Sequence, residues 1–388
     1  MLFDTSERFK NLPPYPLAHI PALRRRLKAE GVDLIDLGAG DADLDPPPAV
    51  VRRLAEAAGE RELSRYPFQV GLVALREAIA AWMQERFGVR LDPHDEILPL
   101  IGSKDGIAHL PLAFMDPGDV AVIPDPGYQA YRGGIVLAGG IPHAVPLLQE
   151  NEFLIPLEGL VESLSGHLRL LYLNYPNNPT TATAPLEYFQ DAVALCSREG
   201  AILVHDHAYS ELAFDGYRPP SVLEIDGARE QSIEFHSFSK TYNMTGWRLG
   251  WAAGSAEVIA ALARVKTFVD TGVYMGVQAA GVAALESYAD WVPGNVGLFQ
   301  ARRDAAFEVL REVGFDVRLP RATMYLWVPV PGGELSVDFA ERVLRQEGVI
   351  VLPGSALGAG GEGFFRIALT VGEERLVEAA ERLGRCLA

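Results

Sequence analysis

The sequence contains little of what marks secreted, membrane-bound or metal-clustered proteins. It has only two cysteines in 388 residues, Cys196 and Cys386, which exclude a disulfide framework or a zinc cluster and suit a reducing compartment. It lacks a membrane-length apolar run, because the uncharged stretch 133–149 is interrupted by prolines and glycines. Its first residues lack the apolar core of a signal peptide. We therefore expect a soluble, cytoplasmic protein with no metal site and no membrane partner.

Positive charge is also scarce, since 34 Lys and Arg residues stand against 51 Asp and Glu residues and give a formal net charge of −17. An acidic surface repels nucleic acid, so we expect no nucleic-acid partner and no DNA-binding regulator. The chain does have apolar material for a sizeable core, with 49% hydrophobic and 22% charged residues. Its length predicts about two domains.

Short apolar runs that alternate with helical patterns occupy the chain from about residue 98 to residue 254. Their hydrophobicity is continuous rather than alternating, which is typical of strands buried on both faces. The pattern predicts an α/β fold with a mostly parallel central sheet covered by helices, and in such sheets ligands collect at the carboxyl ends of the strands. The runs are EILPLIGS, DVAVIPDPGY, LRLLYLNYP, AILVHDHAY, SIEFHSFSK and LGWAAGS.

The hydrophobicity pattern of the sequence changes after residues 291–294, where longer helical patterns alternate with short strand patterns. It predicts a smaller α+β domain, on which the proline-rich first segment packs. We thus expect a large domain over residues 41–290 and a small one built from residues 1–40 and 291–388. The expected elements of the small domain are a helix over 295–313, strands over 315–320, 323–330, 349–354 and 364–370, a helix near 336–346 and a closing helix from Glu373.

The stretch from Ser237 to Gly250 carries the clearest chemistry. It places Lys240 at the carboxyl end of a buried run, between hydroxyl side chains, with Arg248 eight positions later. A partly desolvated lysine near another cation loses its proton easily and can form a Schiff base with an aldehyde. Ser237 and Arg248 can then hold a phosphate. A phosphorylated aldehyde bound to lysine describes pyridoxal phosphate, although a lone Ser-x-x-Lys is most often only a polar loop.

Three residues at other strand ends fit the ring of that cofactor. Asp206 ends the run AILVHD, where a buried carboxylate needs a partner and a pyridinium N–H would supply one. Tyr209 follows it by three residues and can present its phenol near the ring. Asn178 precedes a proline that favours an extended backbone, so its amide can reach a ring oxygen. The ordinary alternatives are an aspartate that caps the next helix and an Asn-Pro turn.

Four further candidates flank this set. Ser103 and Lys104 begin a helix after a strand, where free N–H groups bind anions, and Tyr128 can stack on an aromatic ring. Arg366 lies in the apolar run FFRIAL, where it must pair with a carboxylate of the protein or of a substrate. The alternatives are an ordinary capped helix start and a core or turn tyrosine.

Together these motifs resemble the signature of the class I and II aminotransferases, the fold-type-I pyridoxal-phosphate enzymes. The matching segments are Asn178-Pro-Thr, Asp206-x-Ala-Tyr, Ser237-x-Ser-Lys and Gly246-x-Arg, and the resemblance extends over residues 34–366. One departure is Thr181, where the family has glycine, and it affects a turn rather than a ligand. The resemblance implies a catalytic Lys240, a ring-nitrogen partner in Asp206, phenolic-oxygen contacts from Asn178 and Tyr209, a phosphate site of Ser103, Lys104, Ser237 and Arg248, ring stacking by Tyr128 and a substrate-carboxylate site at Arg366.

The same resemblance implies residues that act on the substrate or across subunits. Gly40 matches a glycine past which the substrate approaches. Tyr66 matches a tyrosine that reaches the phosphate of a neighbouring subunit, which implies a homodimer with shared active sites. The segments SERFKNLPPYPL and DPGYQAY resemble the branch of the family that acts on LL-2,6-diaminopimelate in lysine biosynthesis, and this makes Tyr15 a substrate contact.

The expected reaction is the transamination of an amino acid with 2-oxoglutarate. In this reaction Lys240, once displaced from the cofactor, moves a proton from Cα of the substrate. Two alternatives stay open. One is an aminotransferase of broad range for alanine, aspartate or aromatic amino acids. The other is a pyridoxal-phosphate β-lyase or decarboxylase on the same fold, because the surroundings of the cofactor decide which bond breaks.

Overall fold

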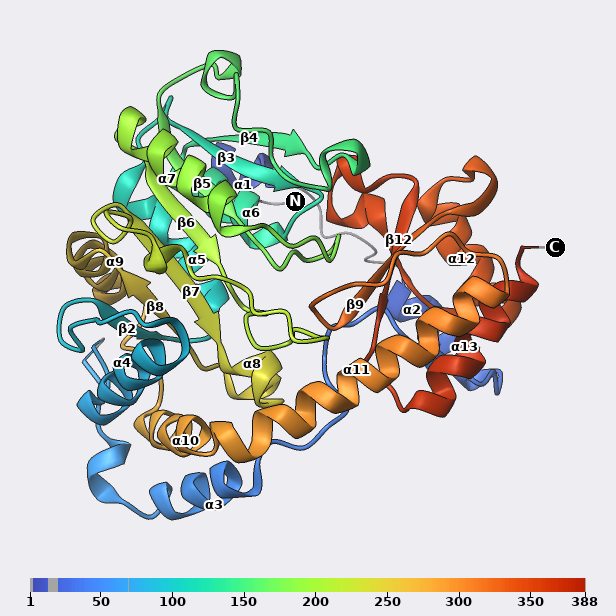
Figure 1. Ribbon diagram of the computed structural model, residues 1–388, viewed down its shortest axis with the longest axis horizontal. Coiled ribbons are helices and arrows are strands. Elements are labelled where there is room, and N and C mark those ends of the chain that lie inside the picture. Colours follow the sequence, from blue (N-terminus) through green and yellow to red (C-terminus); the bar gives the residue numbers. More distant parts are fainter. Residues whose placement is uncertain (1–2, 13–19, 69, 388) are drawn as a thin grey trace.

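A seven-stranded sheet forms the centre of the structure, a computed structural model that describes residues 3–12, 20–68 and 70–387 (Figure 1). The strand order is β2-β8-β7-β6-β5-β3-β4, and all strands are parallel except β8, which runs antiparallel to both neighbours. The strands are β2 (Ile97–Leu100), β3 (Val120–Asp125), β4 (Ile141–Pro146), β5 (Leu168–Leu173), β6 (Ile202–Asp206), β7 (Ser232–Ser237) and β8 (Gly250–Gly254).

Helices cover both faces of this sheet, as the continuous hydrophobicity of the strands predicts. On β5, Leu170 and Tyr172 join one apolar cluster with α5, α6 and α9, while Leu171 and Leu173 join another with α4, α7 and α10. The mostly parallel, helix-covered sheet is therefore confirmed. The helices on this side of the molecule are α3 (Pro48–Ala57), α4 (Val73–Phe87), α5 (Ser103–Phe114), α6 (Gln129–Ala138), α7 (Leu186–Glu199), α8 (Phe238–Thr241), α9 (Ala256–Val269) and α10 (Met275–Glu286).

All six apolar runs form strands, and the sheet has one strand more than these. The additional strand β4 pairs only with β3 at the edge of the sheet and is largely half-buried or exposed. It contains Pro142 and Pro146, which an edge strand tolerates because one side of its ladder needs no partner. Its sequence therefore lacks the apolar run that marks a central strand.

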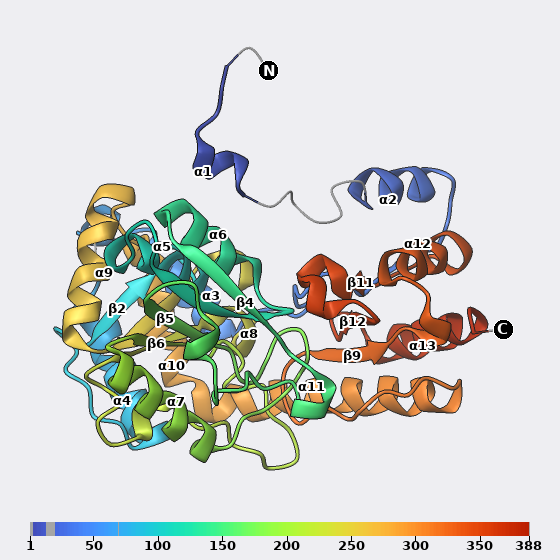
Figure 2. The same cartoon turned by 90° about the horizontal axis from the view of Figure 1, so that it is seen from above.

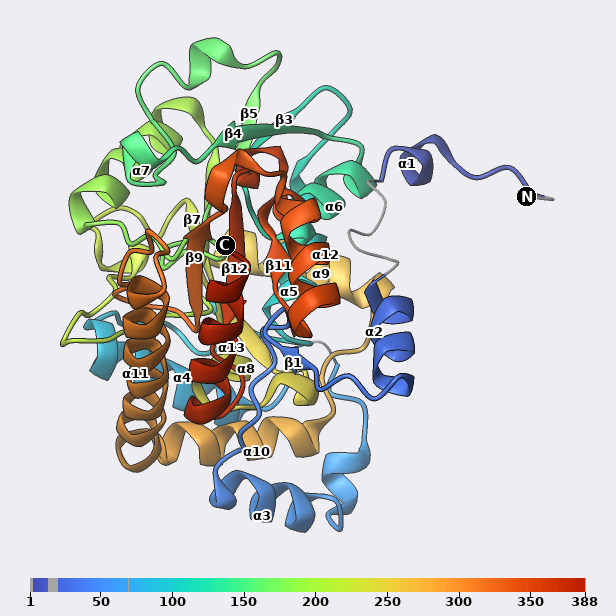
Figure 3. The same cartoon turned by 90° about the vertical axis from the view of Figure 1, so that its right-hand side faces the viewer.

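A second, three-stranded antiparallel sheet packs against long helices at the other end of the molecule (Figures 1 and 3). Its core joins apolar side chains from the strands with those of three helices, as the sequence predicts for an α+β unit. A short parallel pair, β1 with β10, lies beside it. The elements are β1 (Ile35–Asp36), β9 (Tyr325–Pro329), β10 (Val349–Ile350), β11 (Leu352–Pro353), β12 (Phe364–Ala368), α11 (Tyr288–Glu312), α12 (Ser336–Glu347) and α13 (Glu373–Arg385).

The N-terminal helices lie on the outside of the molecule (Figure 2). Helix α2 (Ile20–Ala29) packs Leu23 and Leu27 against Leu344 and Ile350. Helix α1 (Glu7–Lys10) lies instead beside α6, where Arg8 donates a hydrogen bond to the Leu137 carbonyl at 3.3 Å. No helix in the described ranges is long and apolar enough to cross a membrane.

Two expectations for the carboxyl-terminal part are wrong. Helix α11 begins at Tyr288 rather than at residue 295 and continues through Pro293. Pro293 is the sixth residue of α11 and lies beyond the N–H groups that lack an intrahelical acceptor, so the helix continues through it with one backbone hydrogen bond fewer. Residues 315–320 form no strand, although Phe315 and Val317 are buried. Phe315 and Val317 are buried because their side chains pack on the core, and this alternation resembles a strand although no described strand pairs with the segment.

Candidate active site

A cavity of about 960 Å³ lies at the carboxyl ends of the parallel strands and is closed on its far side by residues of β10, β11 and β12. Two predicted residues are not among its described walls: Tyr66, which is 68% exposed on the surface, and Tyr15, which lies outside the described residues. All the other predicted site residues line the cavity: Gly40, Ser103, Lys104, Tyr128, Asn178, Asp206, Tyr209, Ser237, Lys240, Arg248 and Arg366.

Asp206 ends β6 as a carboxylate that is only 5% exposed. The Tyr131 hydroxyl donates to its Oδ2 at 2.7 Å, whereas its Oδ1 is buried without a hydrogen-bond partner in the described structure. Burial raises the pKa of Asp206, and the Tyr131 hydrogen bond opposes that shift. A buried acceptor without a donor is costly, and a protonated ring nitrogen in the cavity would supply the donor. The site therefore fits the pyridine ring of pyridoxal phosphate.

Lys240 lies on α8, the short helix that directly follows β7. The Ser237 side chain caps this helix by accepting from the Ser239 N–H at 3.1 Å. The Lys240 Nζ donates to the carbonyl of Gly40, so an amine from the central sheet reaches the N-terminal segment. A side chain at position 40 would overlap the Tyr325 hydroxyl, and therefore only glycine fits there.

The start of α5 forms an anion site together with Arg248. The Arg248 guanidinium packs so close to Gly102 that a Cβ at position 102 would overlap it, and Gly102 also has a φ of +71°. Arg248 is held there by a hydrogen bond of 2.9 Å from Nη1 to the Thr245 carbonyl. The first N–H groups of a helix lack intrahelical acceptors, so Ser103 and Lys104 add donors beside the cation. Both features attract a phosphate.

Arg366 on β12 has no protein carboxylate as a partner among the described residues. Its Nη1 donates to Asn178 Oδ1 at 2.7 Å and its Nη2 to the Gly38 carbonyl at 2.9 Å, while the guanidinium lies 4.0 Å from the centre of the Tyr325 ring. It is 5% exposed and lines the cavity. A buried cation with only neutral partners favours an anionic ligand, which is the second of the two alternatives for this residue.

Three residues in the cavity region are absent from the sequence-based set. Tyr131 is the partner of Asp206, and Tyr325 lies 3.0 Å from the Tyr209 hydroxyl, oxygen to oxygen. Burial, with Tyr325 as neighbour, raises the pKa of Tyr209. Asn174 donates to the backbone carbonyl of Asp206 at 2.7 Å. Asn174 directly follows the run LRLLYL and Tyr131 lies one helical turn after Tyr128, so strand-end position and helical spacing are the signals that point to them.

Thr181 forms part of a turn outside the cavity, as expected of a departure from the family motif. Its N–H donates to the Asn177 carbonyl at 3.0 Å, and the Asn177 N–H donates to the Ala182 carbonyl at 2.9 Å. Thr181 has a φ of +63°, in the left-handed region that β-branched residues avoid. The chain thus retains the turn at the cost of local strain.

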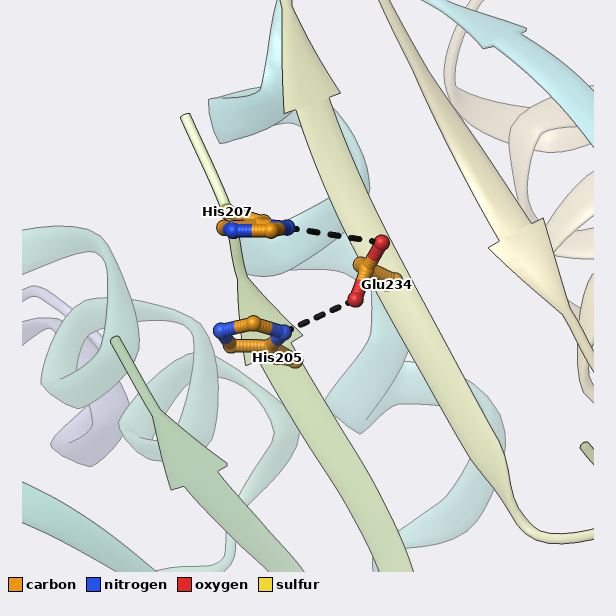
Figure 4. Close-up of side chains that lie close together, drawn as sticks. All are labelled: His205, His207 and Glu234. Carbon is orange, nitrogen blue, oxygen red and sulfur yellow. Dashed lines mark hydrogen bonds and ion pairs between the residues drawn. The ribbon is translucent and has the colours of Figure 1, made fainter. Parts of the chain in front are cut away.

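A second polar cluster lies on the same strands but outside the cavity (Figure 4). Glu234 is fully buried and accepts from His205 Nδ1 at 2.8 Å, His236 Nε2 at 2.7 Å, the Ser221 hydroxyl at 2.9 Å and the Val222 N–H at 3.0 Å. Burial opposes ionisation of Glu234, but the surrounding histidine rings and donors hold its pKa well below the usual range.

His207 lies at the edge of this cluster, with its Nδ1 3.5 Å from Glu234. Burial lowers the pKa of His207 to about 3, so its ring is neutral at neutral pH. The ligand atoms of His205, His207 and Glu234 lie within 4.8 Å of one another, as a metal site would require. Glu234 is already saturated by hydrogen-bond donors, however, so its carboxylate has no free position for a metal ion. Both ring nitrogens of His207 are buried without a hydrogen-bond partner in the described structure.

Comparisons with known proteins agree with this site. The family model for aminotransferase class I and II matches residues 32–383. A protein of Desulforudis audaxviator (strain MP104C) named LL-diaminopimelate aminotransferase is 50% identical over 392 residues, which cover 100% of this chain and 99% of that protein. The substrate-bound structure of BacF from Bacillus subtilis has a TM-score of 0.93 and 31% identity, covering 99% of this chain and 98% of that one. The structure of a probable N-succinyldiaminopimelate aminotransferase from Thermus thermophilus has a TM-score of 0.89 and 39% identity, covering 95% of this chain and 99% of that one.

Proposed function

Because this chain belongs to the class I and II aminotransferases, we propose that it transfers the amino group of LL-2,6-diaminopimelate to 2-oxoglutarate in lysine biosynthesis, with pyridoxal phosphate as cofactor. The observation that carries the chemistry is the unpartnered Oδ1 of buried Asp206 in the same cavity as Lys240. The assignment of the substrate rests on full-length relatives named LL-diaminopimelate aminotransferase, such as those 50% and 47% identical to this chain.

The cavity offers groups for each part of the cofactor. The N-terminus of α5 and the cationic side chains beside it would bind the phosphate, and residues at the ends of β3, β5 and β6 would contact the ring. We assign Ser103, Lys104, Ser237 and Arg248 to the phosphate, Tyr128 to stacking on the ring, Asp206 to the ring nitrogen, and Asn178 with Tyr209 to the phenolic oxygen.

Pyridoxal phosphate supplies, when bound, an electron sink that makes the Cα–H of an amino acid acidic. The protein then has to bind the substrate, orient it and move one proton. Arg366 offers the cation that holds the α-carboxylate, and the missing side chain at Gly40 leaves room for the substrate. We assign Lys240 Nζ as the base that removes the Cα proton and returns it, because this amine donates to the carbonyl of Gly40, the position where the substrate has room.

We extend the proposal to the organisation of the chain. Residues 41–290 form the cofactor domain, and residues 1–40 and 291–388 form a smaller domain that closes over the substrate, with α1 packed on α6 of the cofactor domain. The exposed ring of Tyr66 reaches the phosphate site of a second subunit in a homodimer with shared active sites, which places its contact outside the cavity of its own chain. Tyr15 contacts the substrate. The two cysteines are free and buried, which suits the cytoplasm.

A panel of amino donors with 2-oxoglutarate as acceptor tests the proposal. LL-2,6-diaminopimelate should give the highest kcat/KM, ahead of alanine, aspartate and aromatic donors. A higher kcat/KM for alanine, aspartate or an aromatic donor would instead identify an aminotransferase of broad range. Incubation with the donor alone should release an oxo acid stoichiometric with enzyme and no ammonia. Catalytic release of pyruvate with ammonia would identify a β-lyase instead.

A further inference from the structure

The cavity is strongly cationic although the chain as a whole is acidic. Seven of its lining residues are Lys or Arg and only two are acidic, in a protein with a formal net charge of −17. The cofactor and one carboxylate account for Lys104, Lys240, Arg248 and Arg366 under the proposed function. Three cations remain, and all come from helix α2: Arg24, Arg25 and Lys28, here called the α2 cation cluster.

These three side chains share one face of α2, because residues three and four apart in a helix are neighbours. Leu23 and Leu27 anchor the helix on Leu344 and Ile350, and Ile350 itself lines the cavity. Helix α2 lies near α12 in Figures 2 and 3, and this apolar contact holds it where its three cations line the cavity.

The cluster carries more positive charge than the protein neutralises. Arg24 pairs with Asp36 at 2.8 Å, and Asp36 also accepts from the Gly38 N–H at 3.1 Å. Within the described ranges, Arg25 and Lys28 have no acidic partner. This part of the described cavity wall thus has two cations without an acidic partner, Arg25 and Lys28, and one carboxylate beside them, Asp36. Such a wall suits a ligand whose far end bears a carboxylate, with or without an ammonium group.

We propose that Arg25 and Lys28 bind the distal carboxylate of dicarboxylic substrates, and that Asp36, next to Arg24, binds a distal ammonium group. The assignment rests on the proposed function, because it takes Arg366 to hold the other carboxylate. 2-Oxoglutarate bears a distal carboxylate alone, whereas LL-2,6-diaminopimelate bears a distal carboxylate and a distal ammonium group. One cluster then serves both substrates of the reaction, with Asp36 adding selectivity for the diamine.

Neutralisation of the two free cations tests the carboxylate part. In the holoenzyme, Arg25→Gln with Lys28→Gln should raise KM for 2-oxoglutarate and the dissociation constant of glutarate about 10- to 100-fold, since each cation contributes a charged hydrogen bond. KM for pyruvate and the dissociation constant of butyrate should change less than about twofold, because these ligands have no distal carboxylate. Arg26→Gln is the matched control, since Arg26 lies on the same helix outside the cavity lining.

Equal effects on the dicarboxylate and monocarboxylate ligands, or no effect on either, would overturn the assignment. The binding of glutarate and butyrate needs no turnover, so it decides the question even if LL-2,6-diaminopimelate proves not to be the donor. Asp36→Asn tests the ammonium part: kcat/KM should fall about tenfold for LL-2,6-diaminopimelate and stay unchanged for glutamate, which has no distal ammonium group. An equal fall for both donors would show that Asp36 acts only on the local turn.

Discussion

Asp206 on β6 and Glu234 on β7 are both buried carboxylates of the central sheet, but they differ in the donors around them. Glu234 accepts from four groups, among them His236 and His205, the second of which lies beside it in Figure 4. Asp206 receives one side-chain donor, Tyr131, and keeps one oxygen without a partner. Since His205 and Asp206 are adjacent on one strand, their side chains leave opposite faces, and the two environments are separated by the sheet alone.

The difference separates a structural polar cluster from a functional one. Leaving a buried carboxylate partly unpaired costs free energy, and a saturated network avoids that cost. The protein keeps the unsaturated carboxylate where the strands open onto the cavity and the saturated one where apolar and aromatic side chains surround it. Changes in the first region should therefore affect activity, and changes in the second should affect stability.

The largest effect is expected for Asp206→Asn. The amide cannot supply the negative charge that keeps a ring nitrogen protonated, so kcat/KM for transamination should fall about 10³-fold. The stability of the cofactor-free protein should be unchanged or higher, because an unpaired buried charge is removed. Steady-state kinetics and urea unfolding measure the two effects. A kcat/KM within tenfold of the original value would refute the role of Asp206.

Glu234→Gln should produce the opposite pattern. It replaces a carboxylate that holds two histidine rings, so the free energy of unfolding should fall by about 3–5 kcal/mol. The folded fraction should keep kcat/KM within about threefold, because Glu234 does not line the cavity. Glu230→Gln at an exposed position is the control and should change stability by about 0.5 kcal/mol or less. A loss of activity without a loss of stability would abolish the distinction between the two carboxylates.

The pH dependence of stability should depend on His207. Burial holds its pKa at about 3 in the folded protein, below the unfolded value near 6.5, so the unfolded chain binds the proton first as the pH falls. Stability should therefore decline below pH 6.5, by about 2 kcal/mol between pH 7 and pH 5 from this residue. His207→Phe should remove that part of the slope, as measured by urea unfolding at a series of pH values. An unchanged slope would mean that His207 binds its proton equally well in both states.

The smallest effect is expected for Thr181→Gly, a change of backbone rather than of polar pairing. Glycine accepts the φ of +63° without strain, so the free energy of unfolding should rise by about 0.5–1 kcal/mol after the entropy cost of glycine. kcat/KM should be unaffected, because the turn lies outside the cavity. Thr181→Ala keeps the strain and should give no gain. A change in activity would mean that this turn influences the site through Asn178.

The sequence predicts the central sheet and the groups at its strand ends because both depend on local patterns. A run such as AILVHD identifies a buried strand and places Asp206 at its end in one step. The partners of these groups come from elsewhere in the chain. Tyr131 reaches Asp206 across 75 positions and Tyr325 reaches Tyr209 across 116, and no local pattern carries such contacts. The saturation of Glu234 by residues of three segments is hidden from the sequence for the same reason.

Gly40 and Tyr325 show how such distant contacts restrict the variation of this sequence. A methyl group at position 40 would collide with the Tyr325 hydroxyl, and that hydroxyl is hydrogen-bonded to Tyr209. Loss of the hydroxyl, for example through Tyr325→Phe, relieves the shortest of these contacts but leaves two ring carbons 3.0 and 3.2 Å from the added methyl group, and it also leaves Tyr209 without its partner. One steric contact and one hydrogen bond thus link positions 40, 209 and 325, so changes at these three positions are not independent.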